Sequence, residues 1–95
     1  MFVGVMELHL ALRDNESLKD KRSVVKRTMH RCRNTFNVAV AEVEDNDSSD
    51  RAVLGVTTVG RDKVYVEGLL EAVENFVERL ALAELLECPK TIEVY

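Results

Sequence analysis

Side chains suited to acid–base chemistry are few in this sequence. Of the two histidines, only His9 has a carboxylate, Glu7, two residues away along a segment of strand character. A His–Glu pair can act as general acid and base. Residues two apart share one face of any half-exposed strand, so we interpret the pair as solvated or buried at an interface.

The cysteines and the acidic cluster offer no better chemistry. Cys32 and Cys88 lie far apart without a C-x-x-C motif and are expected to be ordinary reduced thiols. Asp45, Asp47 and Asp50 could offer hard oxygen ligands, but the glycine and terminal glutamate of a calcium loop are missing, which favours a solubilising hairpin. We therefore predict no catalytic residue, no metal site, no cofactor and no enzymatic activity.

Cationic side chains are concentrated in residues 19–33, which hold seven Lys or Arg and one acid, Asp20. Three of the cations fall in the first turns of a predicted helix, where the positive end of the macrodipole makes a cation cost roughly 0.3–1 kcal/mol. Helix stability does not select them, whereas a phosphate backbone would. The residues predicted to contact RNA phosphates are Lys19, Lys21, Arg22, Lys26, Arg27 and Arg31.

Two interpretations of these cations stay open. One flank of the helix holds Lys19, Arg22, Lys26 and Arg33. A second predicted helix carries acids at spacings of four, three and four, namely Glu67, Glu71, Glu74 and Glu78, and could neutralise that flank. Arg27 and Arg31 face away from the core, where either solvent or a partner could meet them.

Hydrophobic periodicity predicts the elements that carry these side chains. Residues 2–12 alternate with period two, so that Met6, Leu8, Leu10 and Leu12 form a core face. The opposite face carries Val3, Val5, Glu7 and His9. The capping box formed by Ser17 and Asp20 predicts a helix from about Leu18, with a core stripe of Leu18, Val25, Met29, Cys32 and Phe36.

The rest of the chain continues the series of strands and helices. Strands are predicted from residue 38 to 43, over 52–59 and over 91–95, with a polar hairpin at 44–50 and a helix from the Asp62 cap to Leu80. The structure of residues 81–90 stays open. The order β-α-β-β-α-β predicts an α+β, ferredoxin-like sandwich, a four-stranded antiparallel sheet with both helices on one face and the first and third strands central. The bare face, with Val3, Val5, Glu7 and His9, is predicted to bind a second copy or a ligand.

Length and composition limit the function classes. Ninety-five residues suggest one domain, 1–95, and 46% hydrophobic with 32% charged residues excludes disorder. No apolar run is long enough to span a bilayer and no export signal is visible, so we expect a cytoplasmic protein without a membrane partner. The net charge of −4 argues against strong nonspecific binding of nucleic acid.

Two ferredoxin-like functions are disfavoured by the residues. RNA-recognition motifs stack bases on aromatic side chains of the central strands, and the third strand here, AVLGVTTV, has none. Acylphosphatases use an arginine and an asparagine in a glycine-rich loop. Arg13 and Asn15 are roughly placed for that role, but the loop RDNES has no glycine.

The segments VGVMELHLAL, SLKDKRSVVKR, FNVAVAEVEDND and RAVLGV together resemble the small bacterial YlxP-like family, a domain of unknown function. The resemblance spans residues 2–59 and extends more loosely into the second helix. It implies a ferredoxin-like domain, often dimeric, whose genes tend to lie near those for transcription-elongation and translation-initiation factors and ribosome-binding factor A. It implies no established activity and transfers no catalytic residue. The hairpin DNDSSD lacks the bulky apolar residues of many relatives.

Three hypotheses follow. The first is a non-enzymatic accessory protein of translation or ribosome maturation that binds rRNA or a ribosomal subunit through the basic helix. The second is a homodimeric interaction or small-ligand module that uses Val3, Val5 and His9 of the open sheet face. The third, hydrolysis of a phosphate ester, would depend on Arg13.

Overall fold

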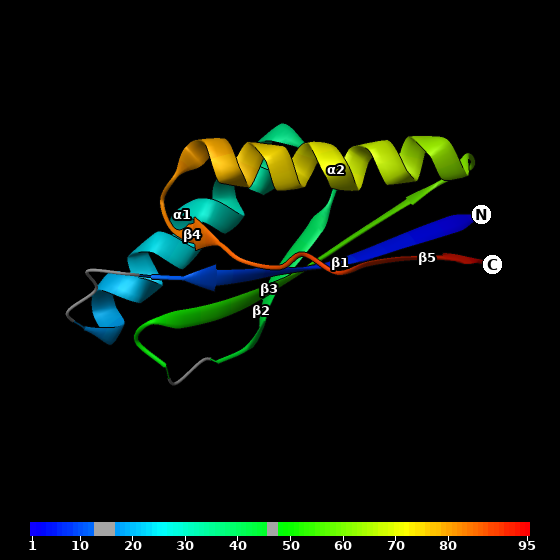
Figure 1. Cartoon of the computed structure of the whole chain (residues 1–95). Helices are drawn as coiled ribbons and strands as arrows, with labels where there is room; N and C mark the ends of the chain where they lie inside the picture. The colour runs from blue at the N-terminus through cyan, green and yellow to red at the C-terminus, as the bar shows by residue number, and fades with distance from the viewer. Residues whose placement is uncertain (13–16, 46–47) are drawn as a thin grey trace.

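A computed structural model describes residues 1–12, 17–45 and 48–95, and its elements follow the predicted βαββαβ order (Figure 1). The elements are β1 (Phe2–Ala11), α1 (Leu18–Thr35), β2 (Ala39–Glu44), β3 (Arg51–Gly60), α2 (Lys63–Leu80), β4 (Glu84–Leu85) and β5 (Lys90–Val94). All strand pairs are antiparallel in the order β2-β3-β1, and β4 and β5 share the far edge of β1. The predicted α+β, ferredoxin-like plan with β1 and β3 at the centre is confirmed.

The register of the sheet confirms the two faces predicted for β1. Met6, Leu8 and Leu10 are at most 1% exposed and pack under the helices. On the opposite face Val5 stands beside Thr57 of β3, and Glu7 stands beside Gly55. The side of the sheet away from the helices is therefore open.

α1 begins where its cap predicts but packs on a rotated stripe. The Ser17 hydroxyl accepts a hydrogen bond from the Asp20 amide at 3.2 Å, which satisfies one free donor of the first turn. The fully buried positions are Lys21, Val25, Thr28 and Cys32, whereas the predicted members Leu18, Met29 and Phe36 are only half-buried. The helix is thus turned toward β2 relative to the expected orientation.

α2 packs closely on β1. The Asp62 carboxylate accepts from the Val64 amide at 3.0 Å, and Ala81, with a left-handed φ of 53°, ends the helix. A Cβ at Gly4 would lie 2.6 Å from Val66 Cγ1, so the close approach of helix and strand requires glycine there. Within the described ranges, no helix combines the length and apolar character that a membrane span requires.

Residues 81–90, whose state the sequence left open, return along the edge of β1. The Leu86 amide donates to the His9 carbonyl at 2.8 Å, and the Glu7 amide donates to the Pro89 carbonyl at 3.0 Å. Proline is tolerated here because residue 89 lies between β4 and β5 at the edge of the sheet and supplies only an acceptor to β1. The short strands β4 and β5 therefore act together as the fourth strand of the sheet.

Candidate nucleic-acid interface

Five of the six predicted cations lie on the exposed side of α1. They are Lys19, Arg22, Lys26, Arg27 and Arg31, and all five are exposed. None of the ion pairs formed between described residues uses any of them. At about 100° per residue they spread over roughly half of the helix circumference, opposite the buried stripe. Their positive charges are directed outward.

Lys21 is a correction, because it does not belong to this surface. Its side chain is 1% exposed, its ammonium donates to the Asp45 carbonyl, and the Nζ atom lies 3.1 Å from Glu42 Oε2. Asp45 has a left-handed φ of 63°, which aspartate tolerates better than most residues. Lys21 therefore joins α1 to the end of β2. At about 100° per residue, Lys21 and the exposed Arg22 lie equally far, about 50°, on either side of the centre of the predicted apolar stripe, so the helical period did not distinguish the buried cation from the exposed one.

Arg33 is also used inside the fold. Its Nη2 donates to the Val40 carbonyl at 2.6 Å, on β2. β2 is an edge strand, and unpaired carbonyls on such an edge invite pairing with another chain. Arg33 and Lys21 together bind main-chain carbonyls at both ends of β2, so two cations of α1 act as structural clamps.

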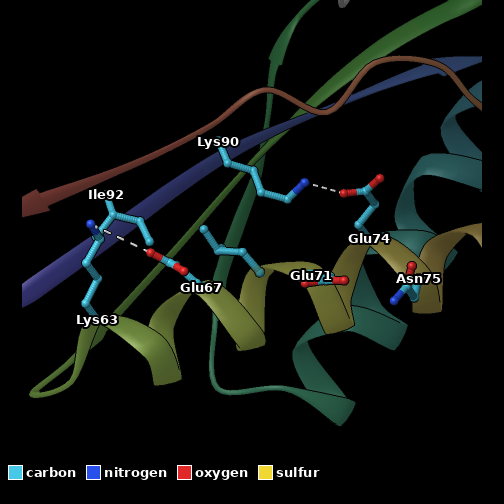
Figure 2. Close-up of a pocket in the computed structure, with 8 residues that line it drawn as sticks. Lys63, Glu67, Glu71, Glu74, Asn75, Lys90 and Ile92 are labelled. Carbon is cyan, nitrogen blue, oxygen red and sulfur yellow. Dashed lines mark hydrogen bonds and ion pairs between the residues drawn. The ribbon is translucent and has the colours of Figure 1, made fainter.

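The acids of α2 do not neutralise α1. Within the described part of the chain no ion pair joins the two helices. Glu67 pairs with Lys63 at 3.8 Å, and Glu74 pairs with Lys90 of β5 (Figure 2). These pairs lie in a cleft of about 550 Å³ between α2 and β5. The alternative of charge pairing across the helix seam is therefore not observed.

The charge of the chain is strongly divided. α1 holds seven of the 13 Lys and Arg and one of the 17 Asp and Glu, which leaves six cations and 16 acids in the rest of the chain. The corresponding net charges are +6 and −10. In the electric field of a negatively charged partner, such a charge distribution orients the domain so that its basic side faces the partner.

His9 and Glu7 form the predicted pair on the open face. Their Nε2 and Oε1 atoms lie 2.8 Å apart, and the side chains are 24% and 46% exposed. Their neighbours on β3 are Val53 and Gly55, which contribute no reactive group. The geometry provides a hydrogen-bonded pair and no adjacent nucleophile from β3.

An apolar trough lies beside this pair. It has a volume of about 280 Å³ and is lined by Val5, Ala39, Val40, Ala41, Val43, Gly55, Val56 and Thr57. Val5 and Val43 are 46% and 53% exposed. The Thr57 hydroxyl already donates to the Gly4 carbonyl at 2.8 Å, so the trough offers mainly hydrocarbon to a ligand.

Both thiols are protonated at neutral pH. Burial raises the pKa of the Cys32 thiol from 9.0 to about 11, with a small opposing effect of Arg33. Burial, reinforced by Glu74, raises the pKa of Cys88 to about 11 as well. Neither cysteine is therefore an activated nucleophile, because the thiolate is the reactive form.

The free energy of unfolding is expected to fall between pH 9 and pH 11 through Cys32. Because the folded-state pKa lies above the ordinary value, the unfolded chain ionises first, and stability that is complete below pH 9 is lost as pH rises toward 11. Two pKa units correspond to about 3 kcal/mol. Urea denaturation of the wild type and Cys32→Ala should give a stability difference that shrinks across this range. A difference independent of pH would contradict the prediction.

Some predicted candidates lie outside the described residues, namely Arg13, Asn15 and Asp47. Asp50 is described and accepts a hydrogen bond from the Ser48 hydroxyl at 2.8 Å. Over the described positions, no group of three or more His, Cys, Asp or Glu is arranged to hold a metal ion.

Comparison with known proteins places the sequence among uncharacterised relatives. A family model described as "Protein of unknown function (DUF503)" matches residues 3–89. The "Uncharacterized protein YlxP" of Bacillus subtilis (strain 168) is 34% identical over 76 residues, which cover 80% of this chain and 83% of that protein. The resemblance inferred from the segment motifs is confirmed.

Two solved structures are similar in fold. The de novo designed protein Foldit4 has a TM-score of 0.54 at 20% identity, over 96% of this chain and 97% of that one. The de novo designed protein LFR1 1 with ferredoxin fold has a TM-score of 0.50 at 12% identity, over 100% and 87%. At these identities the likeness concerns the fold alone.

Proposed function

We propose that this chain, which belongs to the DUF503 family of proteins of unknown function, is a non-enzymatic accessory protein that binds RNA, and ribosomal RNA in particular, through the exposed face of α1. The observation that carries the proposal is the set of five exposed cations on one helix with no ion-pair partner among the described carboxylates. Phosphate oxygens are the partners that Lys and Arg meet most often in nucleic-acid complexes.

The cost of the arrangement supports an external partner. Lys19 and Arg22 still lie in the first turns of α1, where cations oppose the helix dipole, although Lys21 no longer contributes to that argument. Sixteen acids elsewhere could have neutralised these cations through a different side-chain placement, yet Glu67 and Glu74 pair with lysines outside α1. A phosphate backbone would compensate both costs at once.

Co-sedimentation with ribosomal subunits tests the proposal. The α1 variant changes Arg22, Lys26, Arg27 and Arg31 to glutamine. The matched control changes four exposed cations outside α1 to glutamine, Arg51, Arg61, Lys63 and Arg79, and alters the net charge equally. We expect the α1 variant to be lost from the subunit pellet and the control to be retained. Equal retention of both variants, or no binding by the wild type, would refute the function.

A second candidate function concerns the open sheet face. Exposed Val5 and Val43 border the apolar trough, and Val59, 55% exposed, lies further along the same face. Exposed apolar groups gathered on one face are typical of interaction sites, which favours a homodimer or a small apolar ligand there. Because α1 lies on the other face of the sheet, this function and RNA binding are compatible.

Light scattering at micromolar concentration distinguishes a monomer from a dimer. A dimer that Val43→Lys converts to a monomer would support use of the open face, since a buried lysine without a partner is costly. Val64→Lys, at a 75% exposed position in the first turn of α2, is the matched control and should leave the dimer intact. A wild-type monomer would count against a homodimer.

A further inference from the structure

We infer that the RNA bound by α1 is double-helical, with α1 lying across the shallow minor groove and one row of cations along each phosphate strand. This inference rests on the proposed function and names its partner more closely. The positions of the exposed side chains around α1 support it.

The cations of α1 form two rows. At about 100° per residue, Lys19, Arg22 and Lys26 fall within one sector of roughly 60°, and Arg27 and Arg31 fall in a second sector centred about 130° away. All five are exposed. On a helix about 10–12 Å in diameter, two rows so separated stand on opposite sides of its exposed surface. A single phosphate strand reaches one such row, whereas the two strands that border a groove reach both.

Uncharged polar side chains fill the strip between the rows. They are Ser23, His30 and Asn34, and all three are exposed. His30 Nε2 and Asn34 Nδ2 lie 3.0 Å apart, which orients the imidazole ring and the amide with respect to each other. The minor groove of A-form RNA displays 2′-hydroxyls and base edges, which are hydrogen-bonding partners for such groups.

The depth of the surface also fits this groove. Lys21, Val25, Thr28 and Cys32 bury one side of α1 against the sheet, so only half of the helix cylinder protrudes. Half of a helix about 10–12 Å wide suits a wide, shallow groove better than the roughly 8.5 Å deep major groove of B-DNA. The clamps made by Lys21 and Arg33 hold the helix on the sheet in this half-exposed position.

The aromatic ring that α1 offers for stacking on single-stranded bases is the imidazole of the exposed His30, because residues 18–35 contain no Phe, Tyr or Trp. The exposed tyrosines are Tyr65, in the first turn of α2, and Tyr95. α2 begins beside the chain termini, whereas α1 begins at the other end of the molecule (Figure 1). Recognition of single strands depends heavily on aromatic stacking, so the α1 surface favours a duplex.

Fluorescence polarisation with three labelled probes tests the inference. The probes are a 16-base-pair RNA duplex, one of its strands alone, and a DNA duplex of the same sequence. We expect the RNA duplex to bind at least ten-fold more tightly than either of the others. The variants Arg22→Gln/Lys26→Gln and Arg27→Gln/Arg31→Gln, one for each row, should weaken duplex binding to a similar degree, and Tyr65→Ala should not affect it.

The outcomes separate this inference from the proposed function. Single-stranded RNA binding as tightly as the duplex, or a row variant without effect on the duplex, would overturn the duplex assignment and leave RNA binding in place. Equal affinity for the DNA duplex would overturn the minor-groove placement. Failure of every RNA probe to bind would overturn the proposed function itself.

Discussion

Affinity for double-helical RNA is expected to fall about 500-fold when the salt concentration rises from 50 to 200 mM, because each phosphate contact releases condensed counterions. Five exposed cations, one per phosphate, give a slope of log affinity against log salt of about −4.5. A four-fold change in salt then changes the affinity by about four to the power 4.5. The slope is the decisive quantity, since the number of phosphate contacts sets it.

Variants test whether the cations of α1 cause the slope. Arg27→Gln/Arg31→Gln should reduce its magnitude by about 1.8, whereas Arg61→Gln/Arg79→Gln, at exposed positions outside α1, should leave it unchanged. Binding measured by fluorescence polarisation at five or more salt concentrations gives the slope directly. A wild-type slope near −1 would mean that α1 does not contact phosphates as proposed.

Lys21→Ala is expected to destabilise the fold by about 3 kcal/mol, because removal of one partner of a buried ion pair leaves the other charge uncompensated. Lys21 is 1% exposed, whereas the Glu42 side chain keeps 23% exposure, so the lower end of the usual range applies. Glu42 Oε2 is buried and accepts no well-aligned hydrogen bond from the described residues, so it depends on the charge of Lys21. The Asp45 carbonyl also loses its donor.

Urea denaturation measures this loss, and the melting temperature should fall by about 15 °C for a domain of this size. Lys19→Ala, at an exposed position of the same helix, is the matched control and should change stability by less than about 0.5 kcal/mol. The double variant Lys21→Met/Glu42→Leu should recover most of the loss, since a well-packed apolar pair often replaces a buried ion pair without cost. A loss below about 1 kcal/mol in Lys21→Ala would contradict the clamp assigned to Lys21.

The same prediction bears on RNA binding. Lys21 is not expected to contact RNA, but its removal would free the start of α1 from the end of β2. Lys21→Met/Glu42→Leu replaces the ion pair with apolar packing between α1 and β2, and it should therefore bind RNA with wild-type affinity. This outcome would separate the structural cation from the five exposed ones.

The sequence by itself determined the features that depend on neighbouring residues. Period-two alternation in β1 placed Met6 and Leu8 in the core and His9 beside Glu7 on the open face, because alternate strand side chains must point to opposite faces. Ser17 and Asp62 marked the helix starts, because a cap is satisfied within three residues of itself. The exposure of Arg27 and Arg31 followed from the helical period, because both lie on the side of α1 opposite the predicted core stripe.

Only the tertiary structure decided what Lys21, Arg33 and residues 81–90 do. Lys21 binds the Asp45 carbonyl 24 residues away, and that contact exists because α1 is rotated toward β2 by about 40° relative to the apolar stripe. Arg33, near the other end of α1, reaches the Val40 carbonyl of β2, a contact that no local pattern indicated. Residues 81–90 lack a clear period, and their extended path depends on amides and carbonyls that β1 offers across the chain. Local pattern thus set each element, and packing between elements selected which cations remain free for a partner.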